Sequence, residues 1–111
     1  MFGRPSIPSV QAAAVAPDAF LLDVREVDEW DAGRAEGALH IPLMELPHRL
    51  AEVPTDTQVV VVCRVGGRSA QATSWLAAQG YDAVNLDGGM FAWASAGRAM
   101  VRDGDVPAVV L

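Results

Sequence analysis

The chain has 111 residues, the size of one compact domain, and we expect a single domain over residues 1–111 with its core at about 7–101. Eight basic residues against 14 acidic ones give a net charge of −6, which argues against nucleic acid as a partner because phosphates would be repelled. The 51% hydrophobic content excludes a disordered chain, and the lone cysteine excludes an internal disulfide and a multi-cysteine metal site.

The apolar runs of the chain are short. Val59–Cys63 is far below the roughly 18 residues that a membrane span needs. The apolar stretch from Val10 to Ala16 is broken and follows two prolines, which is not typical of a signal peptide. Because a single thiol also fits a reducing compartment, we expect a soluble cytoplasmic protein without a membrane partner.

The first half of the chain alternates short predicted strands with helical segments. A strand at Ile7–Val10 would lie at a sheet edge, because Pro8 cannot donate to a ladder. The apolar run Phe20–Val24 favours a buried parallel strand. Further elements are expected as a first helical turn at Glu26–Asp31, a brief strand at Ala38–Ile41, and a helix that starts at Pro47 and runs through Glu52.

The second half of the chain contains the predicted central strand of the sheet. Val59–Val62 has four β-branched residues without alternation, which is typical of a central strand covered on both faces. A helix is predicted over Ser69–Gln79, with Ala70, Thr73, Leu76 and Ala77 facing inward and Gly80 ending it. Next come a strand at Ala83–Leu86, a turn at Asp87-Gly88-Gly89 and a helix at Met90–Ala96, whereas the sequence from Val101 onward predicts no element.

Strands that alternate with helices at this spacing predict an α/β fold, with a mostly parallel sheet and helices on both faces. Such sheets bind ligands at the carboxyl ends of their strands. Cys63 directly follows the predicted central strand, and therefore lies where a ligand is expected.

The loop after this strand has the features that activate a thiol. Two glycines let backbone N–H groups converge on the sulfur, and the following helix adds its positive end. Arg64 and Arg68 place two permanent positive charges there, which favours an anionic substrate in an otherwise acidic protein. The alternative is that Cys63 is only a small buried hydrophobic residue, the commoner role of a lone cysteine.

Four motifs follow one another along the chain. They are Leu21-Leu22-Asp23-Val24-Arg25-Glu26 with Glu29-Trp30, Gly33 and Gly37-Ala38 before Ile41-Pro42, the loop Cys63-Arg64-Val65-Gly66-Gly67-Arg68-Ser69, and Leu86-Asp87-Gly88-Gly89 with Trp93 and Gly97. In this order and spacing they resemble the single-domain rhodaneses, a sulfurtransferase family. The resemblance implies a five-stranded parallel sheet, a persulfide on Cys63, and an active-site loop formed by residues 63–69.

Two positions depart from the family's pattern. Arg34 stands where relatives often have histidine, so any role of that histidine is absent from this chain. Val65 occupies a loop position that is often small or polar in relatives, which bears on substrate preference more than on reactivity.

The resemblance implies a reaction in two steps without a cofactor. The Cys63 thiolate takes the sulfane sulfur of a small anionic donor such as thiosulfate, and cyanide or a thiol then removes it. Arg64 and Arg68 would orient the donor, and Ser69 would cap the helix and donate to the sulfur. Alternatives are a non-catalytic rhodanese-like module and a sulfur carrier loaded by a persulfide on another protein. Cysteine phosphatases are disfavoured because they use Cys-x5-Arg, whereas four residues separate Cys63 from Arg68 here.

Other polar and aromatic residues are given supporting roles. Asp23 and Arg25, at the end of the neighbouring strand, pair with each other or brace the loop, and we expect an ion pair that sets geometry. Trp30 and Trp93 are expected to be core anchors. His40 and His48 are not predicted to be general bases, and the chain offers no cluster of ligands for a metal.

Overall fold

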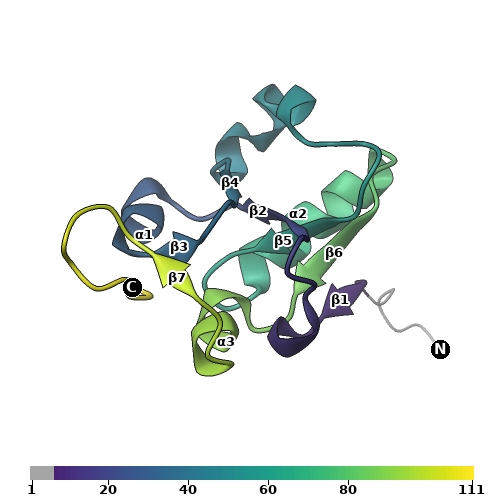
Figure 1. The fold of residues 1–111 in the computed structure, drawn as a ribbon. Coiled ribbons are helices and arrows are strands. Elements are labelled where there is room, and N and C mark those ends of the chain that lie inside the picture. The colour runs from purple at the N-terminus through teal and green to yellow at the C-terminus, as the bar shows by residue number, and fades with distance from the viewer. Residues whose placement is uncertain (1–6) are drawn as a thin grey trace.

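The structure is a computed structural model, and it describes residues 7–111. A five-stranded sheet has the order β1-β6-β5-β2-β4, and all four neighbouring pairs are parallel (Figure 1). Its strands are β1 (Ser9–Val10), β2 (Phe20–Asp23), β4 (Leu39–His40), β5 (Val59–Val62) and β6 (Ala83–Leu86). The predicted α/β fold with a parallel sheet is therefore confirmed.

The central strand β5 is buried on both faces, as its run of valines predicts. All four of its residues are at most 2% exposed. Val59 and Val61 belong to one hydrophobic cluster together with Cys63, whereas Val60 and Val62 belong to the cluster on the other face. Because successive side chains of a strand point to opposite faces, Cys63 continues the first of these two faces.

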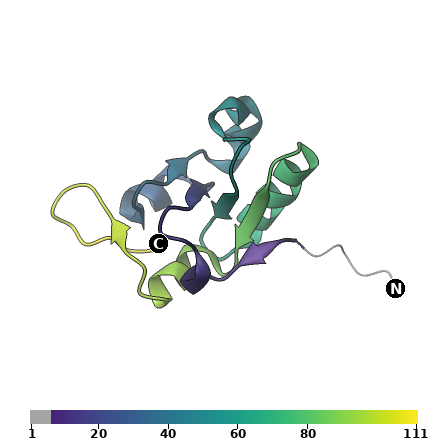
Figure 2. The same cartoon turned by 45° about the vertical axis from the view of Figure 1, so that its right-hand side comes forward.

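Helices cover each face of the sheet. The 3-10 helices η2 (Leu43–His48) and η3 (Leu50–Glu52) and the helix α2 (Gly67–Ala78) lie over the face of Val59 and Val61. The 3-10 helix η1 (Ala12–Ala14) and the helix α3 (Gly89–Ser95) cover the opposite face, where Figure 2 shows them side by side. The remaining helix, α1 (Val27–Ala32), follows β2.

The segment around Pro47 differs from its prediction. The helix begins at Leu43, directly after Pro42, so Pro47 lies inside it and not at its first position. Proline has no N–H to donate, and the chain forms two short 3-10 helices here instead of an α-helix.

The inward face of α2 is also rotated relative to its prediction. Thr73 and Leu76 are buried as expected, but Ser69 and Ala72 accompany them, whereas Ala70 is half-buried and Ala77 is exposed. The helix begins at Gly67, two residues before the predicted start, and Ser69 turns toward Cys63. Apolar spacing alone cannot show this, because alanine carries little information about which face is buried.

A small antiparallel sheet joins β3 (Arg34–Ala35) to β7 (Met100–Val101), and the sequence does not predict either strand. After β7 the chain loops outward and returns (Figure 1). Val109 then donates to the Ala32 carbonyl at 2.9 Å, and a Cβ on Gly33 would come within 2.6 Å of the Val109 oxygen. Within residues 7–111, no helix combines the length and the apolar character needed to cross a membrane.

Candidate active site

The cysteine loop connects the carboxyl end of β5 to the start of α2. Cys63 is 1% exposed, and the loop turns at Gly66, whose φ of +108° is a left-handed conformation that favours glycine. Gly66 is the N-cap of α2, and the first residue of the helix is Gly67. This turn brings the first N–H groups of the helix back over the end of the strand, where the sulfur lies.

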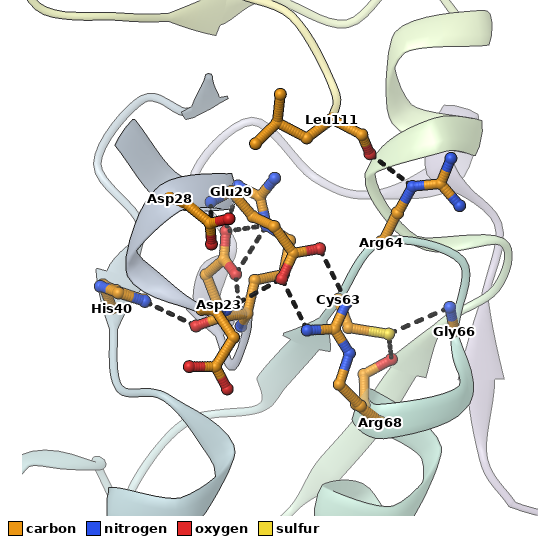
Figure 3. Close-up of polar contacts among 12 residues, drawn as sticks. Asp23, Asp28, Glu29, His40, Cys63, Arg64, Gly66, Arg68 and Leu111 are labelled. Atoms are coloured by element: carbon orange, nitrogen blue, oxygen red, sulfur yellow. Dashed lines mark hydrogen bonds and ion pairs between the residues drawn. The ribbon is translucent and has the colours of Figure 1, made fainter. Parts of the chain in front are cut away.

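The Cys63 sulfur accepts hydrogen bonds from both backbone and side chain (Figure 3). The Gly66 N–H donates to Sγ at 3.1 Å, and the Ser69 hydroxyl donates at 3.2 Å. Burial opposes ionisation of the thiol, but the hydrogen bonds from the Ser69 hydroxyl and from loop N–H groups outweigh it, so the pKa of Cys63 is lowered. The thiolate is therefore the form that this loop stabilises. Ser69 lies in the third position of α2 and does not cap the helix.

The start of α3 holds the cysteine loop from the other side. Met90 donates its backbone N–H to the Cys63 carbonyl at 2.8 Å, and Phe91 donates to the Arg64 carbonyl at 3.0 Å. Gly89 permits this approach, because a Cβ there would lie 2.5 Å from the Cys63 oxygen. The Asp87-Gly88-Gly89 turn thus places two otherwise free N–H groups of a helix start on the loop.

Asn85 holds the same loop from strand β6. Its side-chain amide donates to the Gly66 carbonyl at 3.2 Å, and the residue is 8% exposed. Its Oδ1 has no hydrogen-bond partner among residues 7–111. Asn85 therefore helps to keep Gly66 in its turn, and with it the N–H group that contacts the sulfur.

The two loop arginines have different surroundings (Figure 3). Arg64 is exposed, and its Nε donates to the main-chain oxygen of Leu111. Arg68 makes a two-point ion pair with Glu29 of α1, with its two terminal nitrogens 2.6 and 2.8 Å from the carboxylate oxygens. The sequence shows that the loop carries two positive charges. The structure shows that one of them, Arg68, is paired with the negative charge of Glu29.

Glu29 has a second role at the start of α1. Its Oε1 accepts the backbone N–H of Glu26, and the side chains of Glu26 and Asp28 share the Glu29 N–H, so Glu26 and Glu29 form a capping box. The hydrogen bonds from Arg68 lower the pKa of Glu29 to about 2, against the effect of partial burial. Glu29 is therefore ionised at neutral pH and links the starts of α1 and α2.

Asp23 and Arg25 pair with each other and do not contact the cysteine loop. Both side chains are fully buried and meet at 2.7 Å, and Arg25 also donates to the Gly33 carbonyl at 2.8 Å. The pair fixes the turn after β2 that leads into α1, the helix that carries Glu29. The positive charge of Arg25 also contributes to the lowered pKa of Glu29, as the smallest of the causes.

The two tryptophans expected to be core anchors have different surroundings. Trp93 is a core residue, 5% exposed, whereas Trp30 is half-buried outside both hydrophobic clusters. Trp30 stacks on His40 with ring centroids 4.6 Å apart, and the Arg34 guanidinium lies 5.0 Å from its ring. Arg34 also pairs with Asp103 at 2.8 Å. In residues 7–111, no group of three His, Cys, Asp or Glu side chains is placed to hold a metal ion.

Comparison with protein-family models identifies the family to which this fold and site belong. The family model of the rhodanese-like domain matches residues 8–96, which include both faces of the sheet and the whole cysteine loop. The chain belongs to the rhodanese-like domain family.

Known rhodanese-like proteins resemble the chain in sequence and in fold. A protein of Allochromatium vinosum named sulfurtransferase is 42% identical over 92 residues, which cover 82% of this chain and 86% of that protein. The crystal structure of a rhodanese-related protein from Thermoplasma volcanium matches with a TM-score of 0.80 and 31% identity, over 85% of this chain and 97% of that one. A thiosulfate sulfurtransferase from Pseudomonas aeruginosa matches with a TM-score of 0.78 and 30% identity, over 88% of this chain but 21% of that one.

Three residues of this rhodanese-like site act on the loop from outside it. Glu29 and Gly89 belong to motifs that the sequence shows, but their contacts with Arg68 and with Cys63 join residues far apart in the chain. Asn85 belongs to no motif and has only one signal, a polar side chain within an otherwise apolar strand. A polar side chain buried in an interior strand needs a hydrogen-bond partner. That need is the signal in the sequence that could have identified Asn85.

Proposed function

We propose that this rhodanese-like domain is a sulfurtransferase that carries sulfur as a persulfide on Cys63. The observation that carries the proposal is the surroundings of Sγ, which accepts hydrogen bonds from Gly66 and Ser69 at 3.1 and 3.2 Å and has a lowered pKa. Buried thiols without such donors are inert, whereas thiolates held by a helix start are nucleophilic. The name of the Allochromatium relative, sulfurtransferase, supports the same chemistry.

The first step loads the cysteine. The Cys63 thiolate attacks the outer sulfur of thiosulfate, the S–S bond of the donor breaks, and sulfite leaves with the bonding electrons. A new S–S bond joins Cys63 to the transferred sulfur, which carries the negative charge. The N–H groups of the loop and the helix start then stabilise this persulfide as they stabilise the thiolate.

The second step unloads it. Cyanide or a thiolate attacks the outer sulfur, the bond to Sγ breaks, and the Cys63 thiolate is regenerated. The products are thiocyanate or the persulfide of the acceptor. Neither step calls for a metal or a redox cofactor, because a thiolate is the nucleophile and the leaving groups depart as anions.

The loop arginines provide positive potential beside Cys63. Arg64 is exposed beside the loop and attracts an anionic donor, and Arg68 lies close enough for its charge to interact with that of Cys63. Thiosulfate is the donor we propose first, because the Pseudomonas relative is named for it. A persulfide on another protein would enter by the same attack on an outer sulfur.

Intact-mass spectrometry tests the proposal directly. Purified protein treated with thiosulfate should gain about 32 Da, the mass of the one sulfur atom transferred in covalent catalysis, and a reductant should remove it. Cys63→Ser should show no gain. If wild type also shows none with thiosulfate or with an organic persulfide, although iodoacetamide alkylates Cys63, the domain is a non-catalytic module.

A further inference from the structure

The pair formed by Glu29 and Arg68 bears on which donor the site accepts. Arg68 is one of the two arginines of the cysteine loop, and both of its terminal nitrogens are bound by the Glu29 carboxylate at 2.6 and 2.8 Å. Figure 3 shows the guanidinium between Glu29 and Cys63. The edge of the guanidinium best suited to grip an anion is thus already occupied.

We infer that Glu29 is a specificity-determining residue, which neutralises Arg68 beside Cys63 and so lowers the preference of the site for doubly charged donors over singly charged ones. The inference rests on the proposed function, because it concerns the donor of that reaction. Glu29 does not touch the sulfur, and acts through Arg68.

The surroundings of the pair make this effect strong. The Glu29 side chain is 13% exposed and that of Arg68 is 35% exposed, so solvent screens the pair less than it screens a typical surface ion pair. With Glu29 ionised, the pair as a whole has no net charge. Arg64, the other arginine of the loop, is exposed and donates its Nε–H to the main-chain oxygen of Leu111, so it is not part of this pair.

The substitution Glu29→Gln isolates the charge. Glutamine keeps an oxygen that accepts the Glu26 N–H, so the capping box and the start of α1 are preserved. The same oxygen still accepts from one terminal nitrogen of Arg68, whereas the contact of the second nitrogen and the negative charge are lost. The matched control is Asp28→Asn, which removes one charge from the neighbouring position of α1 and still allows the side-chain oxygen to accept the Glu29 N–H, now at 2.9 Å.

Two alkylating agents of nearly equal size measure the charge at the site without any sulfur transfer. Iodoacetate is an anion and iodoacetamide is neutral, and both react with the same thiolate of the only cysteine. The ratio of their rates therefore cancels any change in thiolate fraction. Glu29→Gln should raise the iodoacetate to iodoacetamide ratio about threefold, as expected for one uncompensated charge near the surface, and Asp28→Asn should raise it less.

The same comparison is made with two donors of similar shape. Thiosulfate carries two negative charges and methanethiosulfonate carries one, and both lose a sulfur to the Cys63 thiolate when sulfite or methanesulfinate leaves. In Glu29→Gln the kcat/KM for thiosulfate, relative to that for methanethiosulfonate, should rise about three- to tenfold, mainly through a lower KM. The double substitution Glu29→Gln with Arg68→Gln should return the relative value to that of wild type.

The outcomes separate the inference from the proposed function. A purely structural role of Glu29 predicts that both alkylation rates fall together with an unchanged ratio, and that result overturns the inference. An alkylation ratio that rises without a change in donor preference also overturns it. If neither donor loads sulfur on any variant, the proposed function fails instead. The alkylation ratio still shows whether Glu29 neutralises the positive charge of Arg68 beside Cys63.

Discussion

The Cys63 sulfur is subject to two opposing effects. It is 1% exposed, and burial by itself makes a thiolate less stable. Hydrogen bonds from Ser69 and from the backbone of the loop reverse this, and the pKa falls below its usual value. The reactivity of this residue therefore depends on a few donors within 3.2 Å of one atom and not on its exposure.

Replacing Ser69 tests the strongest of these donors. Ser69→Ala removes the hydroxyl that donates to Sγ at 3.2 Å, so the pKa of Cys63 should rise, because the thiolate loses a hydrogen bond that stabilises it. The measurement is the pH dependence of the iodoacetamide alkylation rate, whose midpoint should move upward. Ser74→Ala, an exposed position of the same helix, should leave the midpoint in place. Equal midpoints for Ser69→Ala and wild type would contradict this role.

At the scale of elements, the cysteine loop is held between the starts of two helices. The start of α2 points N–H groups at the sulfur, and the start of α3 points N–H groups at the carbonyls of Cys63 and Arg64. The approach of α3 requires Gly89 for two reasons, its φ of +59° and the absence of a side chain facing the loop.

Two glycine substitutions separate these reasons. Gly97 has a φ of +73° and open space around its missing Cβ, so Gly97→Ala should cost only the left-handed strain, about 1 kcal/mol. Gly89→Ala adds contacts of 2.5 to 2.6 Å with backbone atoms of Cys63 and Arg64, and should cost about 2 kcal/mol more. Urea unfolding gives both values. Gly89→Ala should also slow alkylation of Cys63 while Gly97→Ala does not, and equal losses of stability would rule out the close approach.

The sequence predicts the elements whose signal is local. The run of valines in β5 and the apolar stretch of β2 identify the centre of the sheet, and the glycines after Cys63 identify the turn. The fold around Pro47 and the buried face of α2 are not predicted correctly, because neither proline position nor alanine spacing decides them. Strands β3 and β7 have two residues each and pair with one another across most of the length of the chain, a pairing that no local pattern shows.

At the scale of the whole molecule, the contacts that complete the site join distant parts of the chain. Glu29 and Arg68 are 39 residues apart, and Asn85 and Gly66 are 19 apart. The sequence shows each of these residues, but not which of them are in contact. Their pairing depends on how the chain crosses from one strand of the sheet to the next. The loop itself is therefore predictable from sequence, whereas its charge balance is not.

The Glu29–Arg68 pair also links stability to pH. The pKa of Glu29 is lowered from 4.5 to about 2 by folding, so the unfolded chain takes up this proton first as the pH falls. The stabilisation is present above pH 4.5 and disappears as the pH falls toward about 2. The free energy of unfolding of Glu29→Gln, measured with urea, should lie below that of wild type at pH 7 and approach it across this range.

Glu36→Gln serves as the control for this pH dependence. Glu36 is exposed and makes no hydrogen bond or ion pair to the described part of the chain, so the difference from wild type at pH 7 should be much smaller. A gap for Glu29→Gln that stays constant down to pH 2 would show that the ion pair does not stabilise the fold.

The single cysteine of the chain also governs the stoichiometry of the proposed reaction. With no second thiol in these 111 residues, no internal thiolate can attack the persulfide and discharge its outer sulfur. Discharge then requires a collision with another molecule, and its rate depends on the concentration of that acceptor. Without an acceptor, each molecule would bind one sulfur atom and retain it, so the reaction would stop after a single loading step.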